Sequence, residues 1–280
     1  MSLSNFKSVV SVNFLFNNLN NEKVVILDCT IPKVTDASKK VEEKNQIKGA
    51  VFFDIKKMFS ETDSLFPNTI LSPKEFEIKA QLLGINNDSI VICYDDLGIY
   101  SSPRVWWMFH LMGFKNIAVL DGGFPAWKNK QLPIEKPNDF KPQKGNFTVN
   151  YHPEKVKFTK DVLLSLKKNT VLIADARSKG RFLGIDPEPR KEIKSGHIPS
   201  SVSFPFAEIL NNGMIKPVSE LKSIYKNINP ENKDFIFSCG SGITASILAL
   251  GAEIAGYKNY AVYDGSWTEW GSTNGLPIEK

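Results

Sequence analysis

Six consecutive residues near the end of the chain, Cys239-Gly240-Ser241-Gly242-Ile243-Thr244, combine a thiol with a short glycine-rich turn. The turn follows an apolar run (FIF, residues 235–237) typical of a buried strand, and leads into an Ala/Leu-rich segment that predicts a helix over residues 244–255. Such a turn can direct backbone N–H groups and the positive end of the helix dipole toward one anion. A thiolate at Cys239 would be stabilised there, so the spacing predicts a nucleophile. The alternative is a buried cysteine without a chemical role.

Arginine is scarce and unevenly placed. The chain has 31 Lys but only four Arg, and three of these, Arg177, Arg181 and Arg190, fall between residues 177 and 190. A guanidinium holds carboxylate or sulfonate oxygens with two parallel hydrogen bonds, which an ammonium cannot do. The cluster therefore points to binding of an anion, whereas ordinary ion pairing is the simpler interpretation for Arg177 and Arg104.

The chain contains a tandem duplication. GFKNIAVLDGGFPAW (residues 113–127) matches GYKNYAVYDGSWTEW (residues 256–270), and LPIEK occurs at residues 132–136 and again at 276–280. The same alignment pairs Asp95 with Cys239 and Gly98 with Gly242. Only the second copy can do thiol chemistry, and we interpret Asp95 as a structural remnant.

Short apolar strands alternate with helices in both copies, which predicts an α/β fold with a mainly parallel sheet flanked by helices in each. The expected domains are residues 1–136 (non-catalytic), a polar, proline-containing linker at residues 137–153, and residues 154–280, which carry the cysteine loop. The predicted strands are residues 24–27, 89–93, 117–120, 171–174, 234–237 and 261–263, and the predicted helices are residues 73–83, 103–111, 220–226 and 244–255.

Composition excludes several classes of protein. Hydrophobic residues make up 42% and charged residues 23% of the 280 residues, which is typical of a globular protein. The net charge of +5 comes from scattered lysines and gives no reason to expect a nucleic-acid partner. No apolar run has the length of a membrane span, and the first 23 residues do not resemble a secretory signal, so we expect a cytoplasmic protein without a membrane partner.

Cysteine and histidine are too few and too dispersed for a structural framework. Three cysteines cannot all pair, and the spacing of the three histidines does not suggest a metal site. Cys29 and Cys93 end apolar runs, so we expect both to pack in the core. No metal or cofactor is expected.

The motifs, taken together, resemble two-domain sulfurtransferases of the rhodanese superfamily over essentially the whole chain. The resemblance rests on SSPRVWW (residues 101–107), VLDGGFPAW (119–127), DARSKGRFLGIDPEPR (175–190), SGHIPSSVSFPF (195–206), CGSGITA (239–245) and DGSWTEW (264–270). It implies two tandem rhodanese-like domains and a transferase that carries sulfur as a persulfide on Cys239.

The resemblance also implies the partners and the roles of the site residues. The sulfur donor would be the keto acid 3-mercaptopyruvate, which leaves as pyruvate, and the acceptor would be thioredoxin, another thiol or cyanide. Arg181 and Arg190 would bind the carboxylate and keto oxygen, and Ser241 would donate a hydrogen bond or a proton. The loop residues expected to cradle the sulfur are Gly240, Gly242, Ile243 and Thr244, together with Ser241.

The chain departs from the family pattern in its first half. Where the family has a histidine in a proposed proton relay with an aspartate and the loop serine, this chain has Asn68, although Asp54 and Ser241 are present. An amide does not titrate, so we expect Asn68 only to orient substrate or water, and the relay to be dispensable. His197 is expected to tie down its own loop.

Three alternative functions would need other residues than this chain has, or would not need those that it has. Rhodaneses that use thiosulfate carry cationic residues directly after the cysteine, whereas Gly240 and Ser241 are neutral, which favours the keto acid. Cysteine phosphatases need an arginine where this chain has Ala245. A non-catalytic persulfide carrier would have little use for paired arginines near the thiol.

Overall fold

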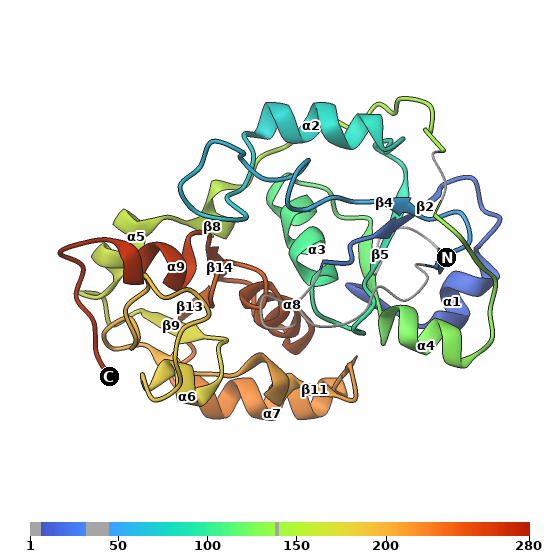
Figure 1. Cartoon of the computed structure of the whole chain (residues 1–280). Coiled ribbons are helices and arrows are strands. Elements are labelled where there is room, and N and C mark those ends of the chain that lie inside the picture. Colours follow the sequence, from blue (N-terminus) through green and yellow to red (C-terminus); the bar gives the residue numbers. More distant parts are fainter. Residues whose placement is uncertain (1–6, 32–44, 138–139) are drawn as a thin grey trace. The chain divides into compact units, whose positions relative to one another are not determined.

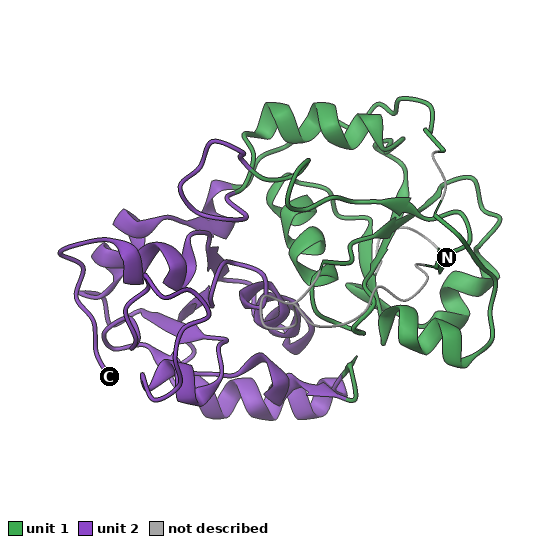
Figure 2. Ribbon diagram, in the orientation of Figure 1, with its two compact units in different colours: residues 1–60, 70–152, 212–214 green, residues 61–69, 153–211, 215–280 purple. Residues whose placement is uncertain are grey.

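The computed structural model describes residues 7–31, 45–137 and 140–280, which form two compact units. Unit 1 takes its described residues from 1–60, 70–152 and 212–214, and unit 2 comprises 61–69, 153–211 and 215–280 (Figure 2). Residues 61–69 thus belong with the second half of the chain. Residues 138 and 139 of the expected linker, and the first six of the N-terminal stretch compared with a secretory signal, lie outside the described residues.

Unit 1 is built on a five-stranded parallel sheet in the order β1-β6-β5-β2-β4 (Figure 1). A short antiparallel pair, β3 (Gln46–Ile47) and β7 (Ile134–Glu135), accompanies it. The sheet strands are β1 (Val9–Val10), β2 (Val24–Asp28), β4 (Val51–Phe52), β5 (Ile90–Tyr94) and β6 (Ile117–Leu120), and the helices are α1 (Val12–Asn17), α2 (Pro73–Leu82), α3 (Ser102–Leu111) and α4 (Gly123–Asn129).

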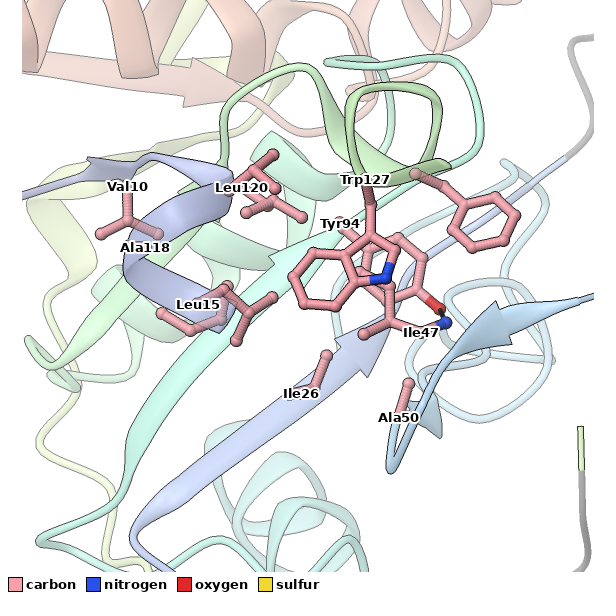
Figure 3. Close-up of a cluster of buried hydrophobic side chains, with 12 residues drawn as sticks. Val10, Leu15, Ile26, Ile47, Ala50, Tyr94, Ala118, Leu120 and Trp127 are labelled. Carbon is pink, nitrogen blue, oxygen red and sulfur yellow. Dashed lines mark hydrogen bonds between the residues drawn. The ribbon is translucent and has the colours of Figure 1, made fainter. Parts of the chain in front are cut away.

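Helices cover both faces of this sheet because successive strand residues point to opposite sides. On one face, Ile26 and Tyr94 pack with Leu15 of α1 and Trp127 of α4 (Figure 3). The Tyr94 hydroxyl accepts the Ile47 N–H at 3.1 Å, so its polar tip has a partner inside the core. The other face carries α2 and α3, whose residues Phe76 and Phe109 meet edge to face with ring centroids 5.0 Å apart.

Unit 2 repeats the arrangement with the parallel sheet β10-β9-β13-β14-β8. Its strands are β8 (Val156–Lys157), β9 (Val171–Asp175), β10 (Val202–Ser203), β13 (Asp234–Ser238) and β14 (Tyr260–Tyr263). Its helices are α5 (Thr159–Ser165), α6 (Lys179–Phe182), α7 (Val218–Ile228), α8 (Ala245–Ala255) and α9 (Ser266–Ser272), with 3₁₀ turns at η2 (Pro153–Lys155) and η3 (Phe206–Ile209). A further two-stranded sheet joins β11 (Leu210–Asn211) to β12 (Met214–Ile215).

The central strand β13 is covered on both sides. Ile236 packs with Trp267 and Trp270 of α9, whereas Phe235 faces Tyr225 of α7 with ring centroids 5.8 Å apart. Helix α8 lies on the side of Tyr225, whose hydroxyl donates to the Leu248 carbonyl at 2.6 Å. Because both faces of β13 are buried, the strand is fixed and the residue that follows it is held in place.

The predicted secondary structure agrees with these elements wherever the sequence pattern was long. The six predicted strands match β2, β5, β6, β9, β13 and β14 to within one residue at each end, and the four predicted helices match α2, α3, α7 and α8 to within two. The two-residue edge strands and the helices of four to seven residues were not predicted, because they cover at most about two periods of a hydrophobic pattern, too few to recognise it. Within the described ranges, no helix has both the length and the apolar character that crossing a membrane requires.

Candidate active site in unit 2

Cys239 lies at the carboxyl end of β13, the middle strand of the unit 2 sheet, and directly before the turn into α8. It is buried, at 1% exposure, whereas Gly240 and Ser241 beside it are partly exposed. Gly242 has a φ of +79°, a left-handed conformation that glycine adopts without a steric penalty. The turn therefore curls tightly around the position of the thiol.

Most amide groups of this turn have no acceptor among the described residues. Within the part of the chain that the structure describes, the N–H groups of Gly240, Ser241, Ile243 and Thr244 donate no hydrogen bond. Since unpaired amides are costly unless water or a ligand satisfies them, this cluster next to the start of α8 is suited to an anion.

The turn after β14 holds the Cys239 loop from one side. Trp267 N–H donates to the Cys239 carbonyl at 2.9 Å, and Thr268 N–H donates to the Gly240 carbonyl at 2.9 Å. Ser266, with a φ of +50°, accepts the Cys239 N–H at 3.2 Å, and its Oγ lies 3.9 Å from the Cys239 sulfur. In a trans peptide the N–H points opposite to the C=O, so these bonds turn the N–H groups of Gly240 and Ser241 away from α9.

The three clustered arginines have different environments. Arg177 is fully buried, with its guanidinium forked onto Asp175 and its Nη1 2.8 Å from Glu188. Glu188 also takes Nε and Nη2 of Arg181 at 3.2 and 2.5 Å. The prediction of ordinary ion pairing is thereby confirmed for Arg177, and Arg181 is oriented by a carboxylate that is itself 2% exposed.

Arg181 lies beside the Cys239 loop, and Arg190 is connected to it through Thr268. A Cβ added to Gly240 would lie 3.4 Å from Nη2 of Arg181, so the guanidinium stands beside this glycine. Arg190 Nη1 donates to Thr268 Oγ1 at 2.9 Å, and that hydroxyl donates to the Gly240 carbonyl at 2.6 Å. One guanidinium group therefore lies beside the residue that follows the thiol, and the other is linked to that residue through Thr268.

Asn68 contacts Ser241, although the two are far apart in sequence. Both belong to unit 2, and Asn68 Nδ2 lies 3.2 Å from the Ser241 carbonyl and 3.0 Å from its Oγ. A carbonyl can only accept, so the amide nitrogen must face it and also donates to Oγ. The expectation was that Asn68 orients substrate or water; the group that it orients in the structure is Ser241.

In unit 1, the position of Asp95 relative to its own loop corresponds to that of Cys239. Its carboxylate accepts N–H groups from Leu97, Tyr100, Ser101 and Ser102 at 2.9–3.1 Å, and the Ser102 hydroxyl at 2.6 Å. Asp95 is completely buried. The duplicated loop thus binds an anion in unit 1, where that anion belongs to the protein, and this agrees with a structural role for Asp95.

The comparisons with known proteins agree with this architecture. Residues 11–130 and 159–273 match the family model described as a rhodanese-like domain. The chain belongs to the rhodanese family. The predicted fold, two tandem rhodanese-like α/β domains, is confirmed.

Relatives of this rhodanese span nearly its full length. Mouse 3-mercaptopyruvate sulfurtransferase is 37% identical and covers 95% of this chain and 92% of its own. Rat thiosulfate sulfurtransferase is 34% identical, with 95% and 92% covered. The crystal structure of SseA from Escherichia coli, titled as that of a 3-mercaptopyruvate sulfotransferase, has a TM-score of 0.83 at 31% identity and covers 93% of this chain and 99% of that one.

The remaining cysteines and His197 of this rhodanese have structural surroundings. Cys29 and Cys93 are buried in the sheet of unit 1, as predicted. The pKa of the Cys29 thiol is raised well above its ordinary value, mainly by burial and secondly by the neighbouring Cys93. His197 stacks on Phe182 at 3.8 Å, and its backbone pairs with that of Glu279, which agrees with a role in tying down the loop. The Asp54 carboxylate accepts the N–H groups of the two lysines that follow it.

No group of three or more His, Cys, Asp or Glu side chains in the described ranges is arranged to hold a metal ion.

The sequence analysis missed three residues that organise this rhodanese site, namely Glu188, Ser266 and Thr268. A signal for two of them was present. Ser266 and Thr268 fall where the duplicated motifs differ, opposite Gly123 and Pro125.

Proposed function

We propose that this rhodanese transfers sulfur from 3-mercaptopyruvate, through a persulfide on Cys239, to a thiol or cyanide acceptor and releases pyruvate. One observation carries the proposal: Cys239 precedes loop amides without acceptors in the described chain, the Arg181 guanidinium stands beside Gly240, and Arg190 is joined to Gly240 through the Thr268 hydroxyl. The mouse and Escherichia coli relatives, both named 3-mercaptopyruvate sulfurtransferase, support the same donor.

The first half-reaction forms one S–S bond and breaks one C–S bond. The Cys239 thiolate attacks the sulfur of 3-mercaptopyruvate, and the electron pair of the C–S bond passes to the carbon, giving the enolate of pyruvate. The proton that the donor sulfur carried balances protonation of that carbon, so pyruvate leaves and an anionic persulfide remains. Neither a redox cofactor nor a metal is needed.

The site has hydrogen-bond donors for each negative charge in this step, on the sulfur and on the keto oxygen. The loop amides of Gly240 to Thr244 stabilise the thiolate and then the persulfide, because their donors face an anion in a buried setting. Arg181 and Arg190 bind the carboxylate and the keto oxygen. The keto oxygen gains charge as the enolate forms, so a guanidinium there binds the transition state more tightly than the substrate.

Ser241 acts as a hydrogen-bond donor to the substrate. Its Oγ accepts from Asn68, so its own proton remains for a carbonyl, a carboxylate or the leaving carbon. Asn68 holds this orientation without exchanging a proton, and no titrating side chain is required at that position.

The choice of donor follows from the charge of the loop. Residues 240–244 are all neutral, which suits a monoanionic keto acid better than the dianion thiosulfate. Because a thiosulfate sulfurtransferase is nearly as similar as the keto-acid enzymes, thiosulfate:cyanide transfer is the second candidate. The deciding measurement is the ratio of kcat/KM for 3-mercaptopyruvate to that for thiosulfate, with Cys239→Ser as the blank. A ratio below one would overturn the keto-acid assignment.

The two domains have different roles. Residues 154–280 carry the chemistry, residues 137–153 link the domains, and residues 1–136 have no thiol at the loop, where Asp95 stands instead. The acceptor is thioredoxin, another thiol or cyanide. A protein that only carries persulfide would release no pyruvate, so pyruvate formation in the presence of 3-mercaptopyruvate separates the enzyme from a carrier.

A further inference from the structure

The side chain of Thr268 lies between a substrate-binding arginine and the backbone of the catalytic loop. Thr268 is buried, at 6% exposure, in the first turn of α9. Its Oγ1 is 2.9 Å from Nη1 of Arg190 and 2.6 Å from the carbonyl oxygen of Gly240. One hydroxyl group therefore touches both parts of the site.

The direction of both hydrogen bonds is fixed by chemistry. A guanidinium only donates and a carbonyl only accepts, so the Thr268 hydroxyl must accept from Arg190 and donate to Gly240. The hydroxyl thus gives the guanidinium an acceptor and the carbonyl a donor. The bond from Arg190 is the stronger kind, because its donor is charged. The chain of two bonds therefore has one possible direction, from Arg190 through Thr268 to Gly240.

This chain sets the orientation of a loop amide. The Gly240 carbonyl receives both the backbone N–H and the hydroxyl of Thr268, which turns it toward α9. The N–H of Ser241 belongs to the same peptide plane and points the opposite way, away from α9. The position of the Arg190 guanidinium and the direction of the Ser241 amide are thus tied to the same hydroxyl.

The duplicated unit gives an internal comparison. Phe124 N–H donates to the Asp95 carbonyl at 2.9 Å, as Trp267 N–H does to the Cys239 carbonyl. The next residue in unit 1 is Pro125, which has neither an N–H group nor a hydroxyl. The bond to the following carbonyl is therefore specific to the unit that carries the thiol.

We infer that Thr268 is a positioning residue that sets the distance between the Arg190 guanidinium and the sulfur-binding amides, and thereby the affinity for the keto-acid donor. The inference rests on the proposed function, since it takes Arg190 as one of the two arginines that bind the keto acid. If the hydroxyl only stabilised α9, its removal would affect binding of the sulfur donor and the later transfer of sulfur to the acceptor alike.

The test compares Thr268→Val with Thr268→Ser. Valine keeps the shape and the backbone N–H but removes the hydroxyl, so KM for 3-mercaptopyruvate should rise about tenfold, the effect of losing one hydrogen bond to a charged group. Serine keeps the hydroxyl and should remain within about twofold of the wild type. Equal KM values for wild type and Thr268→Val, or equal losses in both variants, would overturn the inference.

Two further measurements separate binding from folding and from the proposed function. Persulfide loaded onto Cys239 with inorganic polysulfide, and discharged to cyanide, should react in Thr268→Val at a rate within about twofold of the wild type. A discharge rate that falls as much as donor use would show that the hydroxyl acts on the loop alone and would contradict the link to Arg190. In an Arg190→Ala background, Thr268→Val should cause no further rise in KM. A wild-type protein that does not turn over 3-mercaptopyruvate would instead refute the proposed function, and with it the assigned substrate.

Discussion

The side-chain amide of Asn68 donates to the hydroxyl of Ser241 at 3.0 Å and to its carbonyl at 3.2 Å. Asn68 itself has a φ of +62°, a left-handed conformation in which asparagine is enriched. The pair shows how a neutral side chain can orient a serine hydroxyl in a site whose chemistry depends on moving a proton.

Replacement of Asn68 by alanine should lower kcat/KM for 3-mercaptopyruvate about fivefold, since a single neutral hydrogen bond contributes about 1 kcal/mol. Asn68→His should leave turnover within about tenfold of the wild type, because a titrating group is not required at this position. Steady-state pyruvate release measures both variants. An increase of a hundredfold or more in Asn68→His would show that a proton relay limits the natural enzyme.

Cys239→Ser should abolish sulfur transfer, with a loss of at least about a thousandfold, because a hydroxyl is a far weaker nucleophile and does not form a persulfide. The matched control is Cys93→Ala, which removes a buried thiol from unit 1. That variant should keep its activity within about twofold and lose about 1 kcal/mol of unfolding free energy. Mass spectrometry after incubation with 3-mercaptopyruvate should find a sulfur adduct in the control and none in Cys239→Ser.

Arg181 and Arg177 share the Glu188 carboxylate, yet substitution by lysine should affect them differently. Arg181→Lys should raise KM for the keto acid about tenfold with little change in melting temperature, because an ammonium cannot replace the fork of a half-buried guanidinium. Arg177→Lys should lower the unfolding free energy by about 2 kcal/mol, since it leaves buried oxygens of Asp175 and Glu188 without donors. Kinetics and chemical denaturation are the two measurements. A stable Arg177→Lys with a raised KM would reverse these assignments.

Asp95→Asn should destabilise the protein by about 2–3 kcal/mol, because both carboxylate oxygens accept backbone N–H groups and the amide must set a donor NH2 against at least one of them. Asp88→Asn, at an exposed ion pair with Lys23, is the control and should leave the denaturation midpoint unchanged. Sulfur transfer per folded molecule should be the same in both variants. A loss of catalysis in Asp95→Asn beyond the loss of folded protein would give unit 1 a chemical role.

The central strands and the long helices could be predicted because burial on both faces of a parallel sheet produces continuous apolar runs, such as VVIL before Asp28 and FIF before Ser238. Cys239 and its loop were predictable for the same reason, since the strand and helix that position them are strongly patterned. Strands β4 and β10, of two residues each, have no pattern of their own and are defined by pairing with β2 and β9.

Long-range polar contacts could not be predicted from the sequence. The assignment of residues 61–69 to unit 2, which brings Asn68 to Ser241, depends on tertiary packing that no local pattern records. Glu188 lies within the same motif as Arg190, residues 175–190, but its ion pairs with Arg177 and Arg181 are seen only in the three-dimensional structure. Thr268 was signalled only by a difference between the duplicated copies, which becomes informative once the geometry of both loops is known.

The carboxylate of Asp95 has a consequence for the stoichiometry of anion binding. The duplicated chain has two strand-to-helix loops of similar design, but in unit 1 four backbone N–H groups, those of Leu97, Tyr100, Ser101 and Ser102, already donate to a side chain that belongs to that loop. A free oxyanion that competes with the donor would have to displace a carboxylate present at very high effective concentration, and would fail. Titration with sulfite or pyruvate should therefore reach saturation at one equivalent per chain, in spite of the twofold internal repeat.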